Sequence, residues 1–225
     1  MGDLSQIEIL TFDCYGTLID WETGLRETIA ELAQRHALAS SLDQLLSEWE
    51  AIQFDMITGP YRKYRQIMAD SLRQTFAARE VELTDEESQL LGLRLPDWPA
   101  FADTAESLAR LKQRFKLGIL SNIDDDLLAG SLPKLGVSFD ELVTAEQVQS
   151  YKPALRHFET AMKRLNRPAT AFLHCAFGFK YDQRPALQMG MQTVWVKRPG
   201  WIRDDDAEPT FETPDLAGLA DLLGC

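Results

Sequence analysis

Two acids, two hydroxyls, an amide and a lysine stand near the ends of the predicted strands of this chain. These side chains are Asp13, Thr17, Ser121, Asn122, Lys152 and Asp182. Asp13 follows the apolar run IEILTF, whose β-branched residues predict a buried strand. A carboxylate in that place can attack an electrophilic carbon or phosphorus atom and hold it as an ester or acyl phosphate. The pattern therefore indicates covalent catalysis by Asp13.

The other side chains can perform compatible tasks. The hydroxyls of Thr17 and Ser121, with free backbone N–H groups in the turn after Asp13, can hold the carboxylate or stabilise developing negative charge. Lys152 can neutralise charge, and Asp182 can orient Lys152 or an attacking water. Each residue taken alone has an ordinary interpretation as a turn, cap or surface residue. Their combination favours an active site.

The elements that position these residues alternate between strand and helix in the second half of the chain. This alternation predicts an α/β fold with a Rossmann-like parallel sheet flanked by helices. Ligands bind such a sheet outside the carboxyl ends of its strands, where the chemical side chains would meet. We expect the strands at 7–12, 116–121, 140–148, 170–176 and 191–196.

The first half of the chain has a different pattern. No segment between residues 21 and 95 resembles a strand, and apolar residues recur there at helical spacing, as in Leu25, Ile29 and Leu32. The prolines of LPDWPAF end this region. We therefore expect an α/β core formed by residues 1–19 and 97–225, with a helical cap inserted at 20–96.

Composition restricts the location and the partners. The net charge of −12 excludes a nucleic-acid backbone or an anionic membrane as a partner. No apolar run reaches the roughly 20 residues that cross a bilayer, and no basic segment leads into an apolar one at the N-terminus. Three scattered cysteines predict neither a disulfide framework nor a zinc site, so we expect a reducing cytoplasm.

Four motifs connect these observations to a known group of enzymes. FDCYGTL, LSN, YKP and the late strand followed by Asp182 resemble, in order and approximate spacing, the signature blocks of the haloacid dehalogenase superfamily. FDCYGTLIDW is most similar to the L-2-haloacid dehalogenase branch. The resemblance covers nearly the whole chain, and it implies a Rossmann-like core, an inserted helical cap and Asp13 as the nucleophile.

The same resemblance gives a role to each remaining motif residue. It implies that Thr17 and Ser121 are anion-holding hydroxyls and that Asn122 helps to bind the leaving halide. It makes Lys152 the charge-balancing lysine. It also places Asp182 in the group that positions Lys152 and water.

Two departures separate this chain from metal-dependent phosphatases of the superfamily. Those enzymes carry an acid two residues after the nucleophile, which protonates the leaving alcohol, whereas this chain has Tyr15. A halide leaves without a proton, so Tyr15 suits carbon–halogen cleavage, and we predict it as a substrate- or halide-binding residue, although it could instead pack against the cap. Ala176 and Phe177 replace the Gly-Asp pair that supplies a magnesium ligand, and Asp13 and Asp182 are the acids that remain. We predict no metal or other cofactor.

The dehalogenases that this chain resembles use an arginine of the cap to contact the halide and the substrate, and this chain has a different residue near that position. Glu50 falls near its place, and an acid there would repel an anionic substrate. Arg62 and Arg65, flanked by Tyr61 and Tyr64, offer an alternative binding site for a small carboxylate. The competing interpretation is a solvated basic face with tyrosines in the core.

The predicted function is hydrolysis of a short 2-haloacid to a 2-hydroxyacid through an ester on Asp13. The substrate would be a small anionic molecule, and a homodimer is left open. The alternatives are a magnesium-dependent phosphatase and a catalytically weak binding protein. We interpret His174, in an apolar strand, as a core histidine and the acids at 124–126 as solvated residues at a helix start.

Overall fold

Six parallel strands form a single sheet in the order β3-β2-β1-β4-β5-β6. The computed structural model describes residues 2–198, 203 and 205–225. The strands are β1 (Ile9–Phe12), β2 (Lys116–Ser121), β3 (Glu141–Thr144), β4 (Phe172–Ala176), β5 (Gln192–Val196) and β6 (Phe211–Thr213). Because all neighbouring strands are parallel, their carboxyl ends meet at one edge, which confirms the predicted α/β fold.

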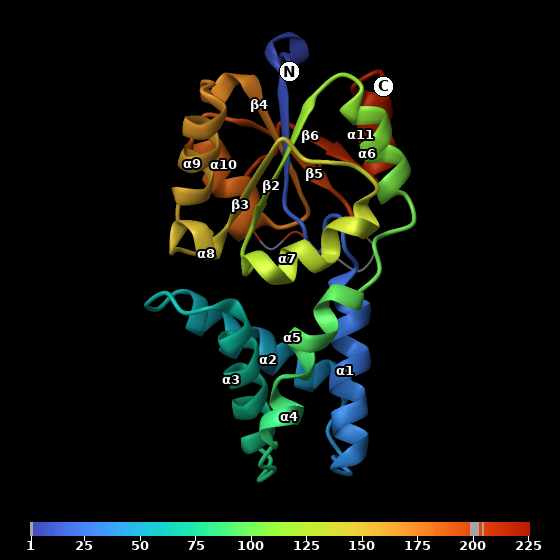
Figure 1. Ribbon diagram of the computed structural model, residues 1–225, viewed down its shortest axis with the longest axis vertical. Helices are drawn as coiled ribbons and strands as arrows, with labels where there is room; N and C mark the ends of the chain where they lie inside the picture. Colours follow the sequence, from blue (N-terminus) through green and yellow to red (C-terminus); the bar gives the residue numbers. More distant parts are fainter. Residues whose placement is uncertain (1, 199–202, 204) are drawn as a thin grey trace.

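Helices cover both faces of this sheet (Figure 1). Those that follow β1 in the chain are α1 (Trp21–Arg35), α2 (Leu42–Ile57), α3 (Tyr64–Ala77), α4 (Asp85–Ser88), α5 (Leu90–Arg94), α6 (Thr104–Lys112), α7 (Asp125–Ser131), α8 (Ala145–Val148), α9 (Arg156–Leu165), α10 (Arg184–Gln188) and α11 (Leu216–Leu222). Helices α6 and α11 pack together, and α9 packs on β2 and β3. Leu10 and Phe12 belong to one apolar cluster and Ile9 to another, as the alternation of side chains along a strand requires.

Helices α1 to α5 form a separate group below the sheet in Figure 1, on the side where β1 ends. The chain enters and leaves this group along neighbouring segments, because the N–H of Asp20 donates to the carbonyl of Pro99 (2.8 Å) and that of Phe101 donates to Leu18 (3.1 Å). This arrangement is the one expected of an inserted cap, and the boundaries at 20 and 96 stay a prediction. None of the helices described is long and apolar enough to cross a membrane.

Some elements differ from the sequence prediction. The strand expected at 140–148 ends at Thr144, because the Thr144 hydroxyl accepts the N–H of Gln147 and caps helix α8. The helix expected from Asp182 is preceded by a π-helical turn, Phe179–Gln183, that contains this acid. Strand β6 was not predicted, since three residues carry too little pattern.

Asp124 corrects the prediction of a solvated acid cluster. Its side chain is fully buried and accepts the backbone N–H groups of Tyr64 (2.8 Å) and Arg65 (3.0 Å) at the start of α3. The residue before α3, Lys63, makes no side-chain cap of its own. An acid of the α/β part therefore supplies the N-terminal cap of a helix in the other group.

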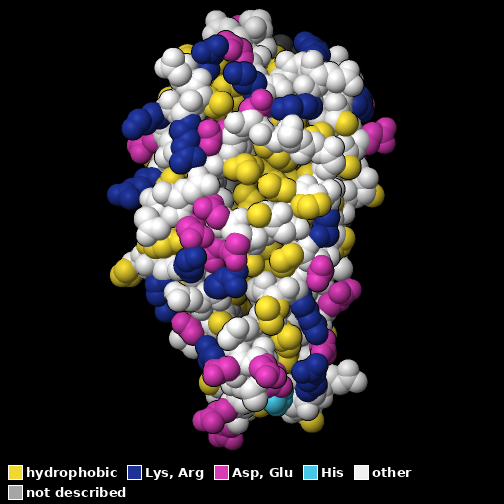
Figure 2. All heavy atoms as spheres, in the orientation of Figure 1, with side chains coloured by type: hydrophobic (Ala, Val, Ile, Leu, Met, Phe, Trp, Pro, Cys, Tyr) yellow, Lys and Arg dark blue, Asp and Glu magenta, His cyan; other side chains and the backbone are white. Residues whose placement is uncertain are grey.

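Tyr151 strengthens the same contact. Its hydroxyl donates to the carbonyl of Arg62 (2.7 Å), and its ring stacks on Tyr61 at 5.6 Å between centroids. The Lys63 ammonium pairs with Glu146 at 2.8 Å. Figure 2 shows acidic and basic side chains gathered beside each other at the level of α7. We call Asp124 and Tyr151 with residues 62–65 the α3 docking contact.

The α3 docking contact predicts a difference between two neighbouring acids. Asp124→Ala should lower the free energy of unfolding by about 1–3 kcal/mol, because it leaves two N–H groups at the start of α3 without their buried acceptor. Asp126→Ala, which removes an exposed partner of Arg65, should cost about 0–1 kcal/mol. Urea unfolding of both variants measures the difference. Equal losses would show that Asp124 does not cap α3.

Candidate active site

Lys152 joins two carboxylates at the carboxyl edge of the sheet. Its Nζ lies 2.9 Å from Oδ1 of Asp13 and 2.5 Å from Oδ1 of Asp182, and it donates a third hydrogen bond to the carbonyl of Leu120 (2.8 Å). Lys152 and Asp182 are each 1% exposed, and Asp13 is 6% exposed. All three donors of the ammonium are thus used, as burial of a charged group requires. The structure brings the predicted nucleophile, lysine and second acid into one buried cluster.

The turn after Asp13 is fixed from two sides. Oγ1 of Thr17 donates to Oδ2 of Asp13 (3.3 Å) and accepts the N–H of Phe177 (3.1 Å). Gly16 has a φ of +96°, a backbone conformation that favours glycine. A Cβ atom at Gly16 would also lie 2.2 Å from the ring of Phe177. The ring of Phe177 therefore lies directly against the nucleophile turn.

Ser121 and Asn122 lie at the end of β2, and Asn122 contacts Lys152 of the cluster. The Asn122 side chain accepts the N–H of Lys152 (2.7 Å) and donates to the carbonyl of Lys152 (3.0 Å). This pair of bonds fixes the backbone that carries the ammonium. Ser121 is 1% exposed, and its carbonyl accepts a hydrogen bond from Nε2 of His157 (3.2 Å). The observed contacts of Asn122 thus orient Lys152, whereas the resemblance implied contact with a halide.

Burial and the two ion pairs set the charge of the cluster. Burial raises the pKa of Asp13 to about 6, against the opposing effect of Lys152. Burial alone would also raise the pKa of Asp182, but Lys152 and a hydrogen bond from His174 outweigh it and hold this pKa below its ordinary range. Burial disfavours the Lys152 ammonium, yet the two carboxylates hold its pKa above the usual value. Near neutral pH the cluster therefore carries two negative charges and one positive charge.

The comparison with known proteins assigns the chain to a family. The model of the haloacid dehalogenase-like hydrolases matches residues 7–175, which is more than half of the chain. This chain is a haloacid dehalogenase-like hydrolase. It is 28% identical over 226 residues to an (S)-2-haloacid dehalogenase of Pseudomonas fluorescens, with 98% of each chain covered. It is 32% identical over 223 residues to a validoxylamine A 7'-phosphate phosphatase of Streptomyces hygroscopicus subsp. limoneus, covering 96% of this chain and 94% of the relative.

The architecture of this hydrolase also matches solved structures. The L-2-haloacid dehalogenase of Xanthobacter autotrophicus superposes with a TM-score of 0.82 at 21% identity, over 97% of this chain and 98% of that one. At this identity the likeness concerns the fold. The predicted Rossmann-like core with flanking helices is confirmed.

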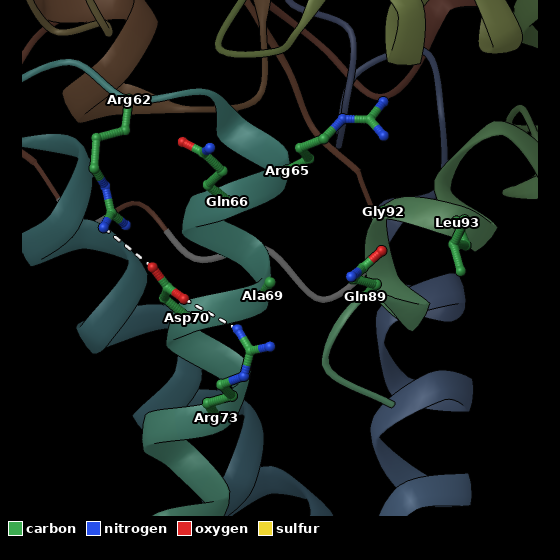
Figure 3. A pocket seen from close by; sticks show the side chains of 9 residues that line it. All are labelled: Arg62, Arg65, Gln66, Ala69, Asp70, Arg73, Gln89, Gly92 and Leu93. Atoms are coloured by element: carbon green, nitrogen blue, oxygen red, sulfur yellow. Dashed lines mark hydrogen bonds and ion pairs between the residues drawn. The ribbon is translucent and has the colours of Figure 1, made fainter. Parts of the chain in front are cut away.

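Three predicted binding residues of the hydrolase have other partners in the structure. Arg62 pairs with Asp70 (3.1 Å), and the guanidinium of Arg65 pairs with Asp126. Both arginines line a cavity of about 520 Å³ between α3 and residues 89–93, which Figure 3 shows from close by. The residues that line this cavity do not include Asp13. The structure thus does not bring the two arginines into the cluster.

Tyr15 is also engaged away from the nucleophile. Its hydroxyl lies 3.0 Å from Oγ of Ser131 on α7, and its ring contacts Trp98 edge-to-face at 6.4 Å between centroids. Burial raises the pKa of Tyr15 well above its ordinary value, so the phenol stays neutral. Both partners lie in the part of the chain predicted as core, so these contacts pack Tyr15 against the core, whereas the sequence left open packing against the cap.

Two buried residues of the site were missed from the sequence. Nε2 of His174 lies 3.1 Å from Oδ1 of Asp182, so this histidine touches the cluster. Arg198 donates from Nε (3.0 Å) and Nη2 (2.7 Å) to the carbonyl of Thr17, and from Nη1 to Asp103 (2.8 Å). Arg198 follows β5, so the rule that drew attention to other strand ends could have found it.

The cluster predicts an unusual titration. We expect the carboxyl carbon of Asp13 to titrate near pH 6 in a ¹³C NMR experiment, with Asp13→Asn identifying its resonance. Lys152→Met should move this pKa upward, because the substitution removes the cation that favours the carboxylate. A midpoint at or below pH 4 in the unsubstituted protein would contradict the effect of burial on Asp13.

Proposed function

We propose that this hydrolase cleaves the carbon–halogen bond of short 2-haloacids and releases 2-hydroxyacids. One observation carries the proposal: Asp13 is a buried carboxylate held by Lys152, and the neighbouring position expected to supply a proton holds Tyr15, bonded to Ser131. A halide needs no proton to leave, whereas an alkoxide does. The (S)-2-haloacid dehalogenase relative supports the same reaction.

In the first step, Asp13 displaces the halide. The Lys152 ammonium holds Oδ1 at 2.9 Å, and the Thr17 hydroxyl donates to Oδ2 over a longer distance of 3.3 Å, so we assign the attack to Oδ2. A bond forms between Oδ2 and carbon 2 of the substrate while the carbon–halogen bond breaks. The halide leaves with the bonding electron pair, and an ester remains on Asp13.

In the second step, water hydrolyses the ester. The water oxygen attacks the carboxyl carbon of Asp13, and its proton passes to Asp182, whose lowered pKa keeps it ionised before the attack. The bond between carbon 2 and Oδ2 stays intact throughout, and the bond between Oδ2 and the carboxyl carbon breaks when the tetrahedral intermediate collapses. The alkoxide then leaves from the carboxyl carbon, takes the proton from Asp182 and departs as the hydroxyacid. Asp13 is left as a carboxylic acid that carries the second proton of the water, and release of this proton to solvent restores the carboxylate beside Lys152.

We propose that neither step requires a metal ion. The Lys152 ammonium already lies between the acids of Asp13 and Asp182, where a divalent cation would need to bind both. Phe177, in place of an acidic ligand, packs its ring on the nucleophile turn. Within residues 2–198, 203 and 205–225, no three acidic, histidine or cysteine side chains gather in a group suited to a metal. These residues do not fit a magnesium site.

Recognition of the substrate would require Arg62 or Arg65 to change partner, because both are paired with acids in the structure. A haloacid adds a negative charge, so a cation must approach it. Arg62 and Arg65 are each about 42% exposed, and exposed ion pairs are weak enough to exchange partners. Either arginine can therefore leave its acid for the substrate carboxylate. The cytoplasmic location and a homodimer stay proposals from the sequence.

Halide release tests the reaction directly. Incubation with racemic 2-chloropropionate should release chloride from at most one enantiomer, because a single attack geometry inverts carbon 2. Asp13→Asn should release none, and brief exposure of the unsubstituted enzyme should add the mass of a propionate ester to the peptide containing Asp13. If no small haloacid tested releases halide, the proposed function is wrong.

The phosphatase is the second candidate, because one relative with a phosphatase name is 32% identical to this chain. The two candidates differ in their need for magnesium. We expect a chelator to leave halide release unchanged, and magnesium to produce no turnover of phosphate esters. Magnesium-dependent phosphate release without any halide release would favour the phosphatase. If neither reaction occurs and Asp13→Asn retains ligand affinity, the chain is a binding protein.

A further inference from the structure

Thr11 and His174 form a buried polar pair inside the sheet. They are register partners on neighbouring parallel strands, β1 and β4, and both are completely buried. Their alternation along the strands puts them on the same face as Ile9 and Phe172, which belong to the apolar cluster beneath α9. Two polar side chains in such surroundings need specific hydrogen bonds to be tolerated.

These hydrogen bonds connect Thr11 through His174 to Asp182, which contacts Lys152. Nδ1 of His174 lies 2.9 Å from Oγ1 of Thr11, and Nε2 lies 3.1 Å from Oδ1 of Asp182. An ionised carboxylate only accepts hydrogen bonds, so the Nε2 atom must carry a hydrogen. Because a neutral imidazole has a single N–H, Nδ1 must then accept from the Thr11 hydroxyl. The neutral tautomer with its hydrogen on Nε2 therefore satisfies both Asp182 and Thr11.

The neighbours of His174 favour this neutral form. Burial is the largest influence and lowers the pKa of His174, and the Lys152 ammonium acts in the same direction, while Asp182 opposes both. From α9, the ring of Phe158 meets the imidazole edge-to-face at 5.1 Å. His157 on the same helix has its own pKa lowered to about 3 by burial, so it adds no charge.

We propose that His174 is a positioning residue of the reaction, which holds the Asp182 carboxylate on Lys152 by donating from Nε2 and leaves Oδ2 of Asp182 to receive the proton of the hydrolytic water. Both bonds to Asp182 end on the same oxygen, Oδ1, as this role requires. The proposal rests on the proposed dehalogenation for its kinetic consequence. The tautomer it requires is independent of any substrate.

Two amide variants of His174 test the roles of its two ring nitrogens separately. A glutamine places its amide near Nε2, so His174→Gln keeps a donor for Asp182, whereas His174→Asn keeps only a partner for Thr11. We expect ester hydrolysis on Asp13 to fall about 100-fold in His174→Asn, because Asp182 loses its fixed position, while formation of the ester changes far less. The covalent adduct should then accumulate in His174→Asn, and His174→Gln should recover much of the hydrolysis rate.

A purely structural role gives a different result. If His174 only fills space in the core, the Asn and Gln variants should lose ester formation and hydrolysis equally, with no accumulated adduct. That result would overturn the proposal. Thr11→Val is the matched control on the other side of the ring, because it removes the hydrogen-bond partner of Nδ1 without touching Asp182.

A measurement without substrate decides the remaining point. Long-range ¹H–¹⁵N NMR of the unsubstituted protein should show His174 as a neutral imidazole with its proton on Nε2 at neutral pH. A proton on Nδ1, or an imidazolium, would overturn the inference whether or not the protein dehalogenates. Failure of the proposed function would instead be seen as absent halide release from the unsubstituted enzyme, with the tautomer still measured.

Discussion

The buried ammonium of Lys152 is the constraint on which the site depends. A charged lysine that is 1% exposed is tolerated only when counter-charges and acceptors surround it. Asp13, Asp182 and the carbonyl of Leu120 meet this need, and each comes from a different strand end or the turn after it. Removing one partner from such a buried pair typically costs about 3–5 kcal/mol. Electrostatic balance therefore fixes three segments of the sheet edge relative to one another.

The reactivity of Asp13 follows from the same balance. Two carboxylates share one ammonium, so neither is fully neutralised, and burial adds to the cost of ionising Asp13. A carboxylate with few hydrogen-bond donors is a better nucleophile than a solvated one, because less of its charge is withdrawn. In the proposed reaction, formation of the ester on Asp13 leaves Lys152 with Asp182 alone, and the remaining pair has no net charge. The cluster thus becomes balanced at the intermediate.

The sequence predicted the cluster because its members obey a local rule. Asp13 and Asp182 follow strand ends that can be recognised from apolar runs, and parallel strands bring those ends together, whereas Lys152 lies beyond β3, after the short helix α8. The partner that Arg65 has in the structure could not be predicted, because Asp126 is 61 residues away in the sequence and no pattern indicates the pairing. Asp124 was misread as solvated because a helix group 59 residues earlier covers it.

His174 shows a different limit of prediction from the sequence. Its partner Thr11 is 163 residues away in the sequence, although strand register makes the two neighbours. A single histidine in an apolar run has no local signal that separates a core residue from one that touches a site. The pairing of two polar residues on the same face of adjacent strands would be such a signal, once the strand order is known.

The α3 docking contact has a consequence for exchanging parts between members of this family. Asp124 lies two positions after Asn122, and Tyr151 immediately precedes Lys152, so the loops that receive the inserted helices are also the loops that hold the ammonium. In a helical insertion transplanted onto another core, the helix equivalent to α3 would be uncapped unless that core carried an acid and a phenol in the same places. The two parts of this protein are therefore not interchangeable modules.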